Sequence, residues 1–257
     1  MNLTFEKLEF FFAILVRISA FIMAAPFFNQ RSVPVRVKAA LSFFIAVIVF
    51  NLTDYKPIGD NFSIQYAVIL IEEALIGASL GFTANLCLYV LDLAGRLIDT
   101  EIGFSMVSVL NPASNIQTSI TGSLLTYLVM LIMLVSRMYY FVISAIVDSF
   151  KFLPIGRVKL PSNAYLVVLD FIKEYFILGF RIVLPVFATI LVVNVVLGVL
   201  AKVAPQMNMF VIGMQLKLFV GLIILFLVIG LIPSITDFIF HEMKYVLDDM
   251  IKIMTPK

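Results

Sequence analysis

Long apolar runs separated by short polar stretches are the dominant pattern of this chain. Three charge-poor runs approach the roughly 20 residues that an α-helix needs to cross a bilayer, and they cover Ala74 to Leu91, Ile182 to Ala201 and Leu218 to Thr236. The pattern as a whole predicts hydrophobic helices near Phe5 to Ala25, Val35 to Leu52, Ile64 to Arg96, Ile116 to Ser149, Tyr165 to Lys202 and Phe210 to Ile232.

The last part of the chain has a different pattern, because apolar residues recur there at spacings of three and four with charges between them. The apolar positions are Ile235, Ile239, Met243, Val246, Met250 and Ile253. This spacing predicts an amphipathic C-terminal tail that lies along a membrane surface or a partner. No stretch resembles a linker or an internal repeat, so we expect an all-α fold in one domain over residues 1–257.

The amino-acid composition indicates whether these helices lie in water or in a membrane. The chain is 62% hydrophobic and 13% charged, with a mean hydropathy of +1.11, whereas soluble domains are about 45–50% apolar. It is therefore expected to be an integral membrane protein. Cys87 and His241 are the only residues of their kinds, which excludes an internal disulfide and a histidine-based metal cluster within the chain. The net charge of +2 indicates no nucleic-acid partner.

A simple transmembrane topology conflicts with the charges of the loops. If the basic loop around Arg36 is cytoplasmic, alternation places Arg137, Lys151, Arg157 and Lys159 outside, against the positive-inside rule. A helix from Ile64 to Arg96 would also be about 50 Å long, against about 30 Å of hydrocarbon. Some helices must therefore bend, pair as hairpins or leave the bilayer.

Glu72 and Glu73 are notable because both lie inside an apolar run. A lipid-facing carboxylate costs several kcal/mol, so at least one should face a partner helix or water. Glu73, Gly77 and Gly81 share one helical stripe, and the two glycines let another backbone approach closely. We expect a packing seam here. Glu73 is then either a hydrogen-bonded structural residue, which would tolerate glutamine, or a proton or ion site.

Two further motifs have simpler interpretations. Gly77 to Gly81 matches the G-x-S-x-G pattern of serine hydrolases, but it lies within an apolar helix and the only histidine is in the tail. We therefore expect no enzymatic activity. The charges Asp92, Arg96 and Asp99 follow helical spacing and are typical of local pairs.

A proline and an amide cluster separates the last two long apolar runs. Pro205 removes a backbone donor, while Gln206 and Asn208 need polar partners if they lie at membrane depth. These three residues are predicted to contribute to packing and assembly, although an ordinary turn between helices would have the same pattern.

Many positions along nearly the whole chain match one family in order and spacing. They are Arg17, Pro26, Pro34, Arg36, Val37, Glu73, Gly77, Gly81, Phe82, Gly95, Asp99, Gly103, Phe104, Ser105, Asn111, Pro112, Ser149, Phe150, Pro154, Pro185, Asn194, Gly198, Ala204 to Asn208, Phe210, Gly213, Lys217 and Gly221. With these residues the chain resembles the FliR/SctT family of type III export gate subunits. The loop from Asn111 to Ser114 is more similar to the flagellar members than to the injectisome (SctT) members.

The resemblance implies a single export-gate domain made of kinked helical hairpins. It implies assembly with FliP and FliQ into a channel for unfolded polypeptides, with FlhB around its entrance and FlhA below. The expected location is the bacterial inner membrane, in contact with lipid at the flagellar basal body. Since the family performs no chemistry, no cofactor is expected.

The resemblance also implies a plug loop from Gly103 to Thr118. Its expected gate residues are Met106, Val109, Asn111 and Pro112. Methionine adapts to irregular contacts, which suits a deformable seal. Family members often carry phenylalanine where Met106 and Val109 stand, and buried loop packing is the alternative interpretation.

Three alternative functions remain open at this point. The first is an injectisome export gate subunit of the SctT type, and the other two are not export gates. A secondary transporter would use Glu72 or Glu73 as its coupling carboxylate, with helices broken at Pro185 and Pro205 around a midplane site. A structural membrane scaffold would have no gate role.

Overall fold

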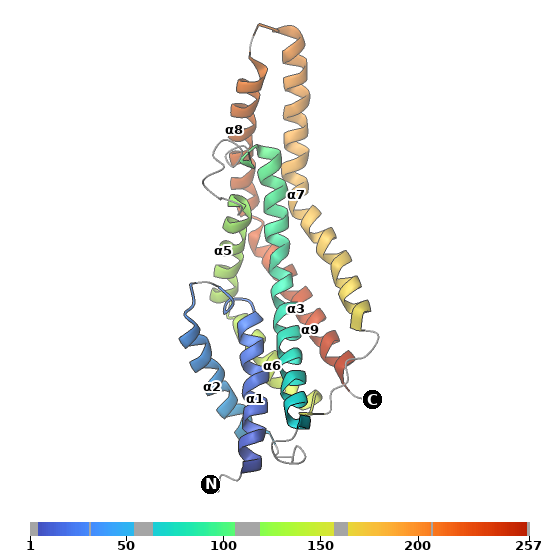
Figure 1. The fold of residues 1–257 in the computed structure, drawn as a ribbon. Coiled ribbons are helices and arrows are strands. Elements are labelled where there is room, and N and C mark those ends of the chain that lie inside the picture. The colour runs from blue at the N-terminus through green and yellow to red at the C-terminus, as the bar shows by residue number, and fades with distance from the viewer. Residues whose placement is uncertain are drawn as a thin grey trace. The chain divides into compact units, whose positions relative to one another are not determined.

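The computed structural model describes residues 5–30, 32–53, 64–105, 119–156, 164–206 and 208–255. Within these ranges it contains eight α-helices and no strand (Figure 1). The helices are α1 (Phe5–Ala24), α2 (Val35–Leu52), α3 (Ile64–Ile102), α5 (Ile120–Val135), α6 (Tyr139–Phe152), α7 (Ala164–Val203), α8 (Met209–Ile229) and α9 (Ile232–Met254). The all-α fold predicted from the hydrophobic pattern is confirmed.

The chain divides into two compact units. The first contains Met1–Cys87, Ser136–Phe171 and Phe240–Lys257, and the second contains Leu88–Val135 and Ile172–Ile239. The first unit thus holds α1, α2, α6 and the beginning of α3. The second holds α5, α8, the end of α3 and most of α7.

The first unit begins with a hairpin of α1 and α2. Phe11 packs edge-to-face against Phe43 and Phe50, with ring centroids 5.8 Å apart in both pairs. Aromatic pairs at this separation and tilt add to the stabilisation from burial alone. Pro34 precedes the first residue of α2, where its missing N–H costs nothing because the first turn of a helix leaves its donors unpaired.

Four helices are long and apolar enough to cross a membrane, and a fifth span is possible if α5 and α6 together form one. These helices are α2, α3, α7 and α8. This finding agrees with the membrane protein expected from composition. Among the four, α3 is the most covered by the rest of the chain, whereas α2 and α8 are mostly exposed.

The helix predicted from Ile116 to Ser149 is wrong as a single element. Within the described residues, α5 ends at Val135 and α6 begins at Tyr139. Arg137, between them, has φ of 59°, in the left-handed region. A left-handed residue cannot continue a right-handed helix. Hydrophobicity alone missed the break because the apolar run continues on both sides of it.

Replacing Arg137 with glycine is expected to stabilise the chain. A left-handed residue other than glycine costs about 1–2 kcal/mol, and glycine at a flexible position costs about 0.5–1 kcal/mol in entropy. The side chain of Arg137 is exposed, so little contact is lost. The melting temperature should rise by a few degrees, as measured by the reaction of the buried Cys87 thiol with a fluorogenic maleimide during heating. Arg137→Val should lower the melting temperature. A higher melting temperature for Arg137→Val than for Arg137→Gly would contradict the backbone strain at this position.

The tail forms α9, and its amphipathic pattern is confirmed. Met243, Val246 and Met250 are buried within the first unit rather than facing a membrane surface or a partner. Lys244 lies 5.1 Å from the ring centroid of Phe141 and 4.9 Å from that of Phe240, a distance at which a cation is attracted to an aromatic face. The chain therefore covers the apolar stripe of its own tail.

Candidate functional site

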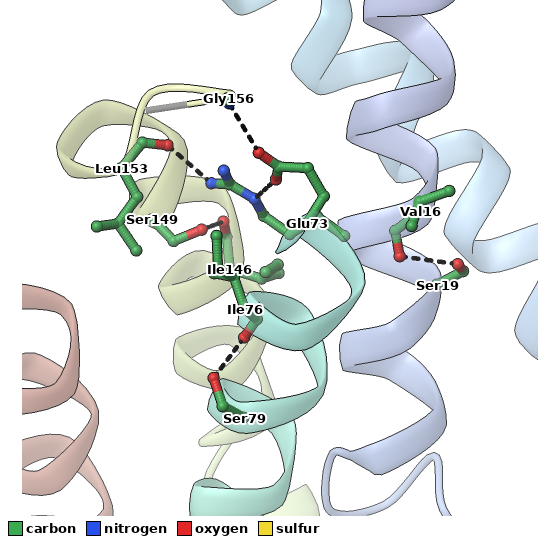
Figure 2. Close-up of polar contacts among 10 residues, drawn as sticks. Val16, Ser19, Glu73, Ile76, Ser79, Ile146, Ser149, Leu153 and Gly156 are labelled. Atoms are coloured by element: carbon green, nitrogen blue, oxygen red, sulfur yellow. Dashed lines mark hydrogen bonds and ion pairs between the residues drawn. The ribbon is translucent and has the colours of Figure 1, made fainter. Parts of the chain in front are cut away.

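A buried ion pair joins α1 to α3 in the first unit. The Nε of Arg17 donates to Oε2 of Glu73, and the two side chains are 0% and 1% exposed. The other oxygen of Glu73 accepts from the backbone N–H of Gly156 at 3.2 Å, and Nη1 of Arg17 donates to the carbonyl of Leu153 at 2.9 Å (Figure 2). The guanidinium also lies over the ring of Phe150, 4.3 Å from its centroid.

These contacts connect three separate segments through one pair of charges. Glu73 comes from the third turn of α3 and Arg17 from α1. The carbonyl of Leu153 and the N–H of Gly156 belong to the turn that follows α6. Because each charge is neutralised by the other, both can be buried together. Removing one partner would leave the other charge uncompensated, which typically costs about 3–5 kcal/mol. The geometry therefore favours the structural interpretation of Glu73 over the proton or ion site.

The glycine stripe next to Glu73 lies against the backbone of α1. A Cβ added to Gly77 would lie 2.0 Å from the carbonyl oxygen of Arg17, and one added to Gly81 would lie 2.5 Å from the carbonyl oxygen of Phe21. Real side chains do not approach a backbone atom so closely. The helix that approaches the stripe is thus α1 of the same chain, and the ion pair lies at the same contact.

The other residues predicted to contribute to packing and assembly are half-buried, exposed or in local contacts. Glu72 is half-buried and makes no side-chain hydrogen bond to a described residue. Pro205 and Gln206 are exposed in the turn between α7 and α8. Asn208 caps α8, where its Oδ1 accepts from the N–H of Val211 at 3.4 Å. Within the described chain this segment has the form of an ordinary interhelical turn.

The expected gate residues lie outside the described residues. These are Met106, Val109, Asn111 and Pro112. The structure therefore describes only the segments that come before and after them, which end and begin at Ser105 and Ser119. Gly103, at the first of these ends, has φ of 99°, a conformation that glycine adopts without strain.

A second polar cluster, in the second unit, fixes the beginning of α5. Asp99 accepts from Oγ of Ser119 at 2.7 Å, from the N–H of Ile120 at 2.8 Å and from the N–H of Thr121 at 3.2 Å. Oγ of Ser119 accepts in turn from the N–H of Gly122 at 2.7 Å. Three N–H groups of the first turn, which have no partner within the helix, thus donate to the side chains of Asp99 and Ser119. Asp99 is a buried carboxylate from α3.

Two glycines allow this cluster to form. A Cβ on Gly95 would lie 2.0 Å from the backbone nitrogen of Gly122, so α3 and α5 touch backbone to backbone here. The contact places the amides of the first turn of α5 within reach of Asp99, one turn further along α3. We call Gly95, Asp99, Ser119 and Gly122 the α5 clamp.

Sequence reasoning missed the partners of both carboxylates. It named Arg17 and Glu73 but did not pair them, although each is a charge within an apolar run and the two have opposite signs. It assigned Asp99 to a helical set with Asp92 and Arg96. In the structure Asp92 and Arg96 do pair, at 2.9 Å, while Asp99 turns away to α5. No spacing rule connects residues 20 positions apart.

Replacing Asp99 with alanine should loosen the start of α5. Each hydrogen bond to a charged group is worth about 1.5–3 kcal/mol, so losing this acceptor should cost roughly 3 kcal/mol locally. The amides of Ile120 and Thr121 should then exchange with deuterium about 100-fold faster. Asp92→Ala is the matched control, since its exposed pair with Arg96 is worth only about 0–1 kcal/mol. Equal rates of deuterium exchange in the two variants would contradict the role of Asp99 in holding the start of α5.

The sequence matches one known protein family over most of its length. The model of a family described as bacterial export proteins, family 1, matches residues 8–243. The chain belongs to this family. The matched range includes the residues of the ion pair, the glycine stripe and the α5 clamp.

Individual bacterial export proteins are similar over most of their length. The flagellar biosynthetic protein FliR of Escherichia coli is 33% identical over 246 residues, which cover 95% of this chain and 93% of that protein. FliR of Bacillus subtilis is 31% identical, with 90% of each chain covered. FliR of Aquifex aeolicus is 32% identical, with 87% of this chain and 88% of that protein covered. All three are named for flagellar biosynthesis and none for an enzymatic activity.

Proposed function

We propose that this chain is a core subunit of the flagellar type III protein export gate. It assembles with FliP and FliQ into the channel that passes unfolded flagellar substrates across the inner membrane, with FlhB and FlhA as neighbours in the basal body. The observation that carries the proposal is the similarity to FliR proteins over about nine-tenths of the chain. The subunit acts as one export-gate domain and needs neither a cofactor nor catalysis.

The exposed apolar faces support assembly with other apolar partners. On α8, Phe219 is 64% exposed and Phe226 is 75% exposed, and on α7 the side chains of Val192 and Val199 are exposed as well. Exposed apolar surface of this extent marks contact with lipid or with other subunits. The exposed turn at Pro205 and Gln206 joins these two helices, so we assign it to the same subunit contacts.

We assign the gate to the segment that contains Met106, Val109, Asn111 and Pro112, as the family resemblance implies. The α5 clamp supports this assignment, because it fixes the point at which the chain leaves that segment. The ion pair of Arg17 and Glu73 and the stripe of Gly77 and Gly81 are assigned to assembly, since they set the position of α1 on α3. Glu72 belongs to the same region of α3 and is half-buried.

The structure offers little support for the rival functions. Glu73 pairs with the buried guanidinium of Arg17 and so has the contact of a structural carboxylate. A transporter of the proposed kind would also need a helix broken at Pro185, whereas α7 continues through this residue from Ala164 to Val203. The three relatives compared above are named for flagella rather than for injectisomes.

Deletion of the gene in its native host tests the proposal. The deletion strain should not secrete flagellar hook or filament subunits and should not spread in soft agar, while a plasmid copy of the gene should restore both. Normal secretion and spreading in the deletion strain would overturn the proposal. Loss of swimming with normal subunit secretion would do so too, because it would place the chain outside export.

A further inference from the structure

A cavity of about 260 Å³ lies in the second unit, between α7, the end of α8 and the start of α9. Its wall is mainly apolar and includes Leu178, Ile182, Val228, Ile235 and Phe238. An engineered cavity of about 150 Å³ with similar walls is large enough for benzene. This one therefore has room for several methylene groups of a chain-like ligand.

One cation lies at the wall of this cavity. Arg181 comes from α7, within the apolar stretch Leu169–Val203, and its guanidinium is 5.7 Å from the ring centroid of Phe238. It forms no ion pair with a carboxylate of the described residues. A charge within an apolar span faces a cavity or a partner and indicates a functional site. The contact with the aromatic face does not use the N–H groups of the guanidinium as an ion pair would. These N–H donors therefore remain for an anion.

Acceptor groups lie beside this cation. Pro185 has no N–H, so it cannot donate to the carbonyl of Arg181, four residues earlier in α7. The hydroxyl of Ser234 also lines the cavity. The residues at the polar part of the site therefore carry guanidinium donors, a hydroxyl and a backbone carbonyl that lacks its usual helical donor, next to the apolar walls of the cavity.

We propose that this cavity binds one anionic phospholipid. The guanidinium of Arg181 binds the phosphodiester, the carbonyl of Arg181 and the hydroxyl of Ser234 bind the hydroxyls of a glycerol headgroup, and the apolar walls hold the first part of one acyl chain. An amphiphile fits both parts of the site, whereas the carboxylate of a partner protein would occupy only the charged part. The membrane in which the chain resides supplies this ligand at high concentration.

Native mass spectrometry of the purified full-length chain in detergent tests the proposal. The probes are dioleoylphosphatidylglycerol, dioleoylphosphatidylcholine and inorganic phosphate, each added in a titration. The wild type should bind one phosphatidylglycerol at least about tenfold more tightly than phosphatidylcholine, and phosphate should not compete. Arg181→Gln should weaken phosphatidylglycerol binding by about tenfold, which corresponds to about 1.4 kcal/mol. Lys202→Gln, an exposed cation of the same helix outside the cavity, should leave it unchanged.

Filling the cavity provides a second test that does not depend on Arg181. In Ile235→Trp the indole should occupy the space of the acyl chain, so binding of both lipids should fall. Equal affinities for the two lipids, or wild-type phosphatidylglycerol binding in either variant, would overturn the proposal. If Arg181→Gln lost FliP or FliQ on purification from cells but kept its lipid affinity, the cavity would be a protein contact and the proposal would be wrong.

Discussion

Replacing Glu73 with glutamine should destabilise the chain by about 3–5 kcal/mol, because the buried guanidinium of Arg17 would lose its ion-pair partner among the described residues. For a chain of this length such a loss lowers the melting temperature by on the order of 10 °C. Heating in detergent with a fluorogenic maleimide measures this directly, since Cys87 is buried and is the only cysteine. This expectation replaces the one drawn from the sequence, that glutamine would be tolerated.

Two controls separate the ion pair from a general effect of substitution in α3. Glu72→Gln changes the neighbouring carboxylate, which is half-buried and makes no hydrogen bond to a described residue, and should shift the melting temperature by a degree or two at most. The double variant Arg17→Met with Glu73→Met should be more stable than either single variant, because apolar replacement of a whole buried pair is often close to neutral. A double variant as unstable as Glu73→Gln would contradict the pairing.

The same double variant also tests the ion-coupling rival. If Glu73 only holds helices together, a strain in which the double variant assembles should still secrete flagellar subunits. If Glu73 carries a proton or ion, methionine cannot replace it, and an assembled double variant would not secrete.

Replacing Gly77 with alanine should cost more than about 3 kcal/mol, above the usual range for an overpacked core residue. The added methyl group would lie 2.0 Å from the carbonyl oxygen of Arg17, a backbone atom that cannot move without moving α1. Displacing α1 would in turn pull Arg17 away from Glu73. The melting temperature should therefore fall by at least as much as in Glu73→Gln, and recovery of the complex with FliP and FliQ should fall with it.

Gly198 provides the matched control for this substitution. It lies in the interior of α7, and a Cβ there would meet nothing within 4 Å. Gly198→Ala should therefore stabilise the isolated chain by roughly 0.5–1 kcal/mol through helix propensity. If Gly77→Ala also stabilised the chain, that result would contradict the close approach of α1 and α3.

The sequence predicted the helices well where local signals mark their ends. The range expected for α2 agrees with the structure at both ends, because Pro34 precedes an apolar run that stops at a polar segment. The break at Arg137 had no such marker. Arg137 has a left-handed backbone conformation there, and the apolar run continues on both sides of Ser136 and Arg137.

The candidate site could be predicted only in part, for a physical reason. Helical spacing correctly grouped Glu73, Gly77 and Gly81 on one face, since that relation is local. The partner of Glu73 is 56 residues away in sequence, and that of Asp99 is 20 residues away. Such pairs depend on how helices pack, which a hydrophobic pattern does not specify.

The composition of the complex formed by this chain tests the central proposal most directly. An affinity-tagged copy, expressed from its own locus, would be purified from native membranes in mild detergent, and the proteins that elute with it would be identified and counted by mass spectrometry. We expect FliP and FliQ to elute with it at fixed ratios, and both to be lost in Gly77→Ala. Elution of the wild-type chain alone, or as a small symmetric oligomer without either protein, would contradict its role as an export-gate subunit.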